Sequence, residues 1–119
     1  MLQNFRHFTA GPDPAGRLWK VDLLWMQNAI AIRHSDSVDV KFLLSGGAEV
    51  LERVVSLRHA DLLELSRKAG HPLTDSWCMS LAARHLLHMV ETGEDFEKTL
   101  VTVRTEELEQ YAAESVSRS

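Results

Sequence analysis

The side chains best suited to chemistry in this sequence are His85, His88 and Glu91, which follow one another at intervals of three residues. On a helix such residues are neighbours, and imidazole nitrogens and carboxylate oxygens are ligands that zinc accepts. The spacing differs from that of an HExxH motif, and the sequence nominates no fourth ligand. The helical pattern assigns His85 to the buried side, and it assigns His88 and Glu91 to the solvent side. We therefore expect a core histidine beside an exposed His–Glu pair, with no metal and no cofactor.

Cys78 is the only cysteine. It falls in the first turn of an expected helix, where the helix dipole favours a thiolate. A nucleophilic cysteine needs a base beside it, but His85 lies about 10 Å further along the same helix, as judged from the rise per residue. The sequence therefore favours Cys78 as a small apolar residue of the core. A single cysteine excludes an internal disulfide and is compatible with a reducing cytoplasm.

The tryptophans Trp19, Trp25 and Trp77 could stack against a ligand, although large aromatic residues more often fill a core. A ligand pocket between sheet and helices, with its mouth near Trp25 and Asn28, is the alternative to the interaction function predicted below. Whether such a pocket would be enzymatic stays open. Its candidate residues are Trp25, Asn28, Cys78 and His85.

Composition narrows the classes of partner. The chain of 119 residues is 45% hydrophobic and 25% charged, which is typical of one globular domain. A net charge of −4, with basic residues scattered among acidic ones, argues against a nucleic-acid partner. We find no apolar run long enough for a signal peptide or a membrane-spanning helix, so we expect no membrane partner and a cytoplasmic location. No motif ties the chain to a known family.

The elements that must position these residues follow from a change in apolar spacing near Leu57. Before it, apolar residues occupy alternate positions, which predicts half-buried strands. Turn-forming residues interrupt this pattern at Gln27–Asn28, at Ser35–Ser37 and at Gly46–Gly47. We therefore predict an antiparallel sheet of four or more strands in a meander, preceded by a short strand over Asn4–Phe8 and a loop over 9–17.

A two-residue turn at Gly46–Gly47 predicts the strand register beside it. Phe42 then lies opposite Leu51, and Lys41 lies opposite Glu52. Arg53 alone is misplaced, because the same register puts it on the inner face. Either a β-bulge displaces Arg53 or its head reaches the sheet edge while its stem is buried, and we favour the bulge.

After Leu57 the spacing becomes helical. It predicts one helix over His59–Ala69, ended by Gly70, and a second that begins at the capping residue Thr74 and ends before Gly93. We expect these two consecutive helices to cover one face of the sheet, which makes the fold α+β. Residues 99–103 could add an edge strand. Residues 105–116 form a docked helix, a partner-binding helix or a frayed tail. The predicted domain covers residues 1–114, with a disordered tail over 115–119.

The predicted register also leaves an apolar row on the outer face of the sheet, away from the helices. An apolar row bordered by charged residues is expected to be covered, either by the C-terminal segment of the same chain or by a partner. A symmetric homodimer is the commonest partner arrangement. We therefore predict a small, non-enzymatic interaction domain that self-associates through this row, or binds another protein with it. Its residues are Leu24, Met26, Ala29, Leu43 and Val50.

Overall fold

The computed structural model describes residues 4–29 and 36–116. Its strands are β1 (His7–Ala10), β2 (Trp19–Ala29), β3 (Ser37–Gly46), β4 (Glu49–Arg58) and β5 (Leu100–Thr102). Its helices are α1 (His59–Ala69), α2 (Asp75–Thr92) and α3 (Thr105–Val116). The residues Ser115 and Val116, assigned to a tail by the sequence, belong to α3, and 117–119 lie outside the described residues.

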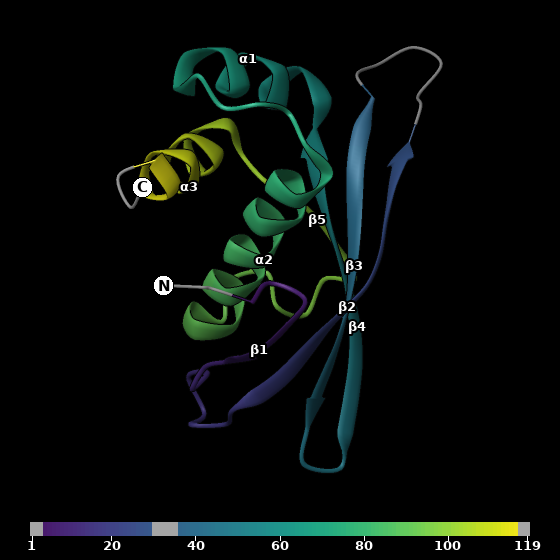
Figure 1. Cartoon of the computed structure of the whole chain (residues 1–119). Coiled ribbons are helices and arrows are strands. Elements are labelled where there is room, and N and C mark those ends of the chain that lie inside the picture. The colour runs from purple at the N-terminus through teal and green to yellow at the C-terminus, as the bar shows by residue number, and fades with distance from the viewer. Residues whose placement is uncertain (1–3, 30–35, 117–119) are drawn as a thin grey trace.

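The strands form one sheet in the order β1-β2-β3-β4-β5. The first four make an antiparallel meander, and β5 lies parallel to β4 at the edge. All three helices lie on one side of this sheet (Figure 1). The predicted α+β fold is confirmed, including the C-terminal helix and the edge strand near residues 99–103.

The predicted turn at Gln27–Asn28 is wrong, because β2 continues through it and pairs Gln27 with Asp39 and Asn28 with Val38. Polar side chains at the end of a strand can face solvent, so they do not have to mark a turn. The strand predicted between this turn and the turn at Ser35–Ser37 lies mostly outside the described residues, which end at Ala29 and resume at Asp36. The pairing shifts between Leu23 and Trp25, which leaves Leu24 as a β-bulge. This shift turns Trp25 to the outer face.

The hairpin between β3 and β4 turns one residue later than predicted. Gly46 still pairs with Glu49, and Gly47, with a φ of 62°, lies in the turn. A Cβ on Gly46 would lie 2.8 Å from the ring of Trp19, so this glycine lets the tryptophan approach the sheet. Phe42 consequently pairs with Arg53 instead of Leu51. Because the register moves by two residues, every side chain keeps its predicted face.

Arg53 stays on the inner face without a bulge, since the β3–β4 pairing is continuous from Ser37 to Gly46. Its Nε donates to the carbonyl oxygen of Phe96 at 2.7 Å, and its guanidinium carbon lies 5.3 Å from the centre of the Phe96 ring. The favoured bulge was therefore wrong. The alternative prediction for Arg53 is correct. Its aliphatic stem crosses the inner face, and its guanidinium reaches the carbonyl oxygen of Phe96 near the sheet edge.

The helices begin and end as their capping residues predict. The hydroxyl of Thr74 accepts a hydrogen bond from the backbone N–H of Trp77, and Gly70 and Gly93 end α1 and α2 in the left-handed conformation. Apolar side chains of α2 then fill the space above the sheet. The buried ones are Trp77, Cys78, Met79, Leu81, Ala82, Ala83, Leu86, Met89 and Val90.

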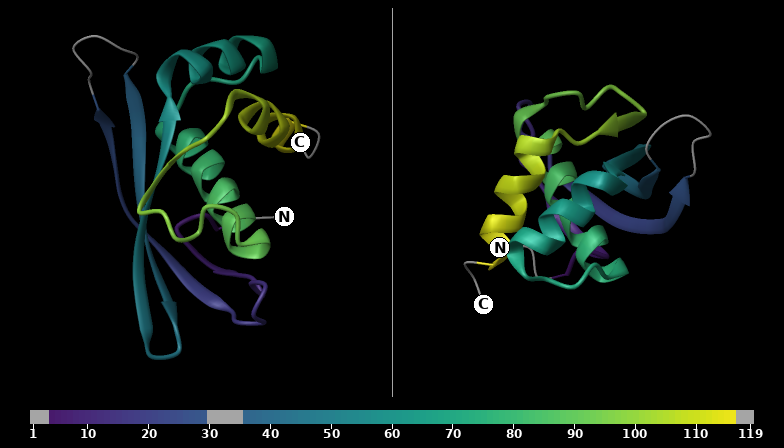
Figure 2. Two further views of the ribbon diagram at one scale, coloured as in Figure 1. Left: turned by 180° about the vertical axis from the view of Figure 1, so that it is seen from behind. Right: turned by 90° about the horizontal axis from the view of Figure 1, so that it is seen from above.

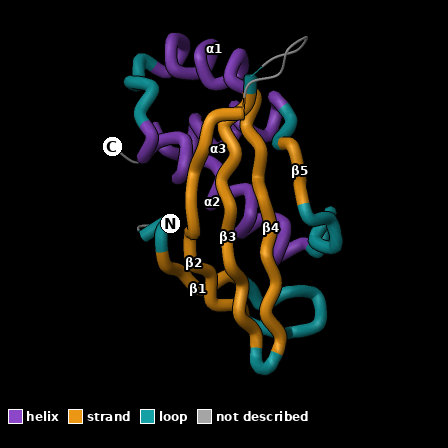
Figure 3. Tube along the Cα trace, turned by 90° about the vertical axis from the view of Figure 1, so that its right-hand side faces the viewer, coloured by secondary structure: helices purple, strands orange, loops and turns teal. Residues whose placement is uncertain are grey.

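The C-terminal helix α3 contacts α1 and α2, on the inner side of the sheet. The views from behind and from above in Figure 2 show it beside these helices. Figure 3 looks onto the outer face, where the strands lie in front and the helices behind. The alternative that the C-terminal segment covers the outer face is therefore wrong for the part of α3 that the structure describes.

Candidate functional site

The outer face, which none of the described helices covers, carries a row of side chains that crosses four strands. Trp25 of β2 pairs with Lys41 of β3, Lys41 pairs with Val54 of β4, and Val54 pairs with Leu100 of β5. The bulge residue Leu24 lies beside Trp25 on this face. Leu43, two residues after Lys41 in β3, faces the same side. We name the apolar members the outer strip. It consists of Leu24, Trp25, Leu43, Val54 and Leu100.

Both ends of the outer strip are open to solvent. Leu24 is 44% exposed, Trp25 38% and Leu100 53%. Between them, the Lys41 ammonium lies 5.7 Å from the centre of the Trp25 ring and 2.8 Å from a carboxylate oxygen of Glu52. The aliphatic stem of Lys41 thus continues the apolar surface while its charge is balanced. Polar residues border the strip on both sides. Asp22 and Glu52 lie beside Leu43 in one neighbouring row, and Asp39 and Ser56 lie in the row on the other side of Lys41.

The single apolar row predicted from the sequence does not form. Met26 pairs with Val40 and packs against the core, because the bulge at Leu24 turns it inward. Leu43 and Val50 face outward but lie in different rows, opposite Glu52 and Ser45. Ala29 pairs with Ser37 at the far end of β2. Leu24, Leu43 and Val50 thus lie on the outer face as predicted, but not in one row.

The four predicted pocket residues do not converge. Asn28 and Cys78 line one hollow of about 170 Å³, together with residues of β2, β3 and the helices. Trp25 faces away from it, on the other side of the sheet, and His85 is buried beneath α3. The sheet itself separates Trp25 from His85, so one cavity cannot include both. The other residues lining the hollow are Met26, Val38, His59, Leu73, Thr74 and Asp75.

Cys78 has the properties of a core residue. Its side chain is buried and unpaired, and burial, with a smaller contribution from Asp75, raises the pKa of its thiol to about 11. A thiol with this pKa is protonated at neutral pH and is a weak nucleophile. The helix dipole at the start of α2 does not overcome the loss of solvation.

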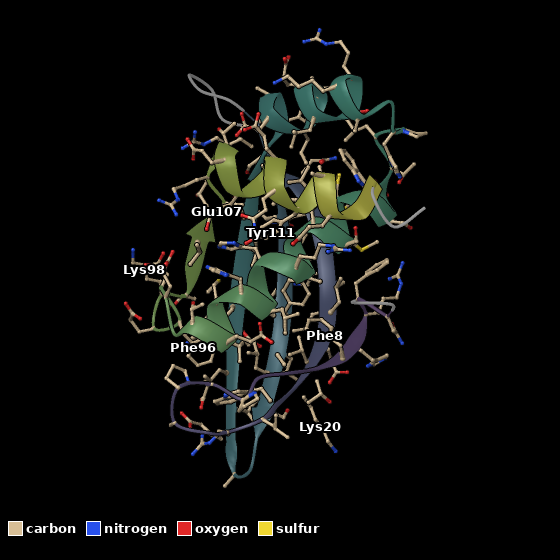
Figure 4. All side chains as sticks on the ribbon, turned by 90° about the vertical axis from the view of Figure 1, so that its left-hand side faces the viewer. Phe8, Lys20, Phe96, Lys98, Glu107 and Tyr111 are labelled. Carbon is tan, nitrogen blue, oxygen red and sulfur yellow. The ribbon has the colours of Figure 1, made fainter. Side chains whose placement is uncertain are left out.

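A second group of polar side chains gathers where α2, the loop after it and the start of α3 meet. Among the described residues, ligand atoms of His88, Glu94 and Glu107 all lie within 4.8 Å of one another. His85 is next to them: its Nδ1 lies 2.9 Å from the hydroxyl of Tyr111 and 3.9 Å from a carboxylate oxygen of Glu107. Figure 4 shows Glu107 and Tyr111 on α3, which crosses α2. We name these residues, with Arg104, the polar cluster.

Arg104 balances part of the negative charge of the polar cluster. The Arg104 Nε donates to Glu107 Oε1 at 3.3 Å, and the Arg104 Nη2 lies 4.0 Å from Glu94 Oε1. Burial acts to raise the pKa of Glu107, but hydrogen bonds from Arg104 outweigh it, and the pKa lies below its ordinary value. Burial lowers the pKa of His85, against the opposing effect of Glu107, so this imidazole is neutral at neutral pH.

The predicted ligand set is only partly brought together. His85 and His88 are neighbours, with ring centres 6.0 Å apart, whereas Glu91 is exposed and takes no part. Sequence reasoning missed Glu94 and Glu107, because they lie in other elements and no local spacing relates them to His88. The available signal was their position, since Glu94 follows the capping Gly93 and Glu107 lies in the first turn of α3.

No helix in the described ranges, 4–29 and 36–116, combines the length and apolar character needed to cross a lipid bilayer. Comparison of the chain with protein-family models, with curated proteins and with solved structures gives no significant match.

Proposed function

We propose that this protein is a small interaction domain that self-associates through the outer strip, as a symmetric homodimer. The observation that carries the proposal is the row Trp25, Lys41, Val54 and Leu100, on the face of the sheet opposite all three helices. An apolar row bordered by charged side chains is the usual composition of a protein interface.

A second copy of the chain suits the outer strip because its two ends are both apolar. In a face-to-face dimer with a twofold axis parallel to the strands, Trp25 of one copy lies over Leu100 of the other, and the Lys41 stem lies over Val54. The acidic residues beside the strip are engaged within the chain. Asp22 contacts His7, Glu52 pairs with Lys41, and Asp39 accepts a hydrogen bond from the Ser37 hydroxyl at 3.0 Å. Two strips can therefore meet while these carboxylates keep their partners within their own chain.

The oligomeric state tests this proposal. We expect the wild-type protein to be a dimer in light scattering and sedimentation, and Leu100→Glu to be a folded monomer, because a carboxylate at the strip end cannot be buried against Trp25 without a partner. The matched control is Leu63→Glu on α1, whose side chain is 51% exposed but lies away from the outer face. It should remain a dimer. A wild-type monomer across the micromolar range, or equal effects of both substitutions, would overturn the proposal.

A cytoplasmic location is part of the same proposal. The unpaired, buried Cys78 is supporting evidence, because a reducing compartment keeps such a thiol free. Fractionation of cells that express the untagged chain tests it.

A further inference from the structure

The polar cluster lies on the helix side of the molecule, and the outer strip does not use it. Its three convergent residues come from separate segments: His88 from α2, Glu94 from the following loop and Glu107 from α3. Their ligand atoms lie within 4.8 Å of one another, although nothing in the local sequence places them together. His88 and Glu107 are half-buried and Glu94 is exposed, so the group is anchored in the fold and open to solvent at one side.

We propose that His88, Glu94 and Glu107 bind one zinc ion. An imidazole nitrogen and two carboxylate oxygens are zinc ligands, with bonds of about 2.0–2.2 Å, and a site with three protein ligands keeps a fourth position for water. Such bond lengths require ligand atoms closer together than 4.8 Å, and rotation of the exposed Glu94 side chain can supply that approach. The imidazole selects zinc over Mg²⁺ and Ca²⁺, because these hard cations prefer all-oxygen sites.

Arg104 occupies the place of a cation in the absence of metal. It bonds to Glu107 and lies beside Glu94, and its side chain is 67% exposed. An exposed arginine can swing into solvent when a divalent ion arrives, so Arg104 and zinc compete for the same two carboxylates. Removal of Arg104 should therefore strengthen zinc binding, which distinguishes a metal site from a purely structural ion-pair cluster.

His85 and Tyr111 support the site from below. The hydroxyl of Tyr111 lies 2.9 Å from His85 Nδ1, and that nitrogen lies 3.9 Å from Glu107 Oε2. This buried pair limits the movement of the Glu107 carboxylate. Neighbours of this kind hold metal ligands in position.

The test uses the untagged full chain, with zinc chloride titrated in a calorimeter and thermal unfolding followed with and without zinc. We expect one zinc ion per chain and a higher unfolding temperature with zinc, because a ligand of the folded state stabilises it. His88→Ala should weaken binding by at least about tenfold, whereas Arg104→Gln should strengthen it. Glu91→Gln, one turn further along α2 and outside the polar cluster, should bind like the wild type.

Zinc binding that survives in His88→Ala would place the ion on another histidine, such as the exposed His7, and would overturn the proposal. So would no binding to the wild type, or weaker binding to Arg104→Gln. Glu94→Gln is the second ligand variant, chosen because an exposed side chain is not needed for folding; it should weaken binding as His88→Ala does. Leu100→Glu should retain zinc binding, so failure of the dimer and failure of the metal site are distinguishable.

Discussion

The two faces of the central strand β3 differ in what covers them. Its inner residues Val40 and Phe42 have no exposed surface, whereas the outer residues Asp39, Lys41 and Leu43 are half-buried. The same backbone thus supports a core that the helices close and a surface that they leave open. Stability therefore depends mainly on the inner layer, and residues of the outer face can change without unfolding the protein.

Thiol reactivity should show the largest difference between the two layers. Because the pKa of Cys78 rises from 9.0 to about 11, the thiolate at pH 8 is roughly a hundredfold scarcer than for a free cysteine, and burial slows the reaction further. Val50→Cys in a Cys78→Ser background places a thiol on the outer face, where Val50 is 60% exposed. This variant should react at the rate of a free thiol. Similar native-state rates for both proteins would show that reagent reaches Cys78 as easily as the outer face.

Two valines, one on each face of the sheet, test how much each face contributes to the free energy of unfolding. Val40→Ala on the inner face should lower the free energy of unfolding by ~2–3 kcal/mol, from lost burial and the cavity left behind. Val50→Ala on the outer face should lower it by under about 0.5 kcal/mol. Urea denaturation at low protein concentration measures both. Equal losses would mean that the outer face is covered even in the monomer.

The buried hydrogen bond between His85 and Tyr111 tests polar contacts within the helix layer. Tyr111→Phe leaves the Nδ1 of a buried, neutral imidazole without its partner, which should lower the free energy of unfolding by ~1–2 kcal/mol. The double variant Tyr111→Phe with His85→Leu should recover part of this loss, because neither position then leaves a buried polar atom without its partner. An unchanged free energy of unfolding for Tyr111→Phe would mean that water reaches His85, and that the helix layer is less closed than the burial of His85 indicates.

The ion pair between Lys41 and Glu52 should show the smallest effect. Their charged atoms are 2.8 Å apart, but the Glu52 side chain is 52% exposed, and such pairs contribute ~0.2–1 kcal/mol. A double-mutant cycle with Lys41→Met and Glu52→Gln, at protein concentrations low enough to give the monomer, measures the coupling, which should weaken in high salt. A salt-independent coupling would show that the outer face is shielded from solvent, as in the proposed dimer.

Much of the fold was predictable because its signals are local. The alternation along β3 specified which residues face the core, and Thr74, Gly70 and Gly93 specified where helices begin and end. These signals depend on backbone geometry within a few residues. Strand alternation and helix capping were enough to predict that the helices cover the inner face of the sheet.

The candidate sites were less predictable, because they depend on pairing between strands and on distant elements. The bulge at Leu24 reversed the faces expected for Trp25 and Met26. No pattern of period two contains such a shift, since the bulge forms only where pairing with β3 and packing below the sheet favour it. The β3–β4 turn likewise begins one residue later than expected, where Gly46 lies against the Trp19 ring.

The sequence by itself determined the fold class, the start of α2, the ends of α1 and α2, and the inner face of β3 and β4, because local periodicity and capping are properties of consecutive residues. Only the tertiary structure decided that Trp25, Val54 and Leu100 share one row, and that Glu94 and Glu107 meet His88. These groups unite residues far apart along the chain, and their meeting follows from how the sheet and helices pack in three dimensions.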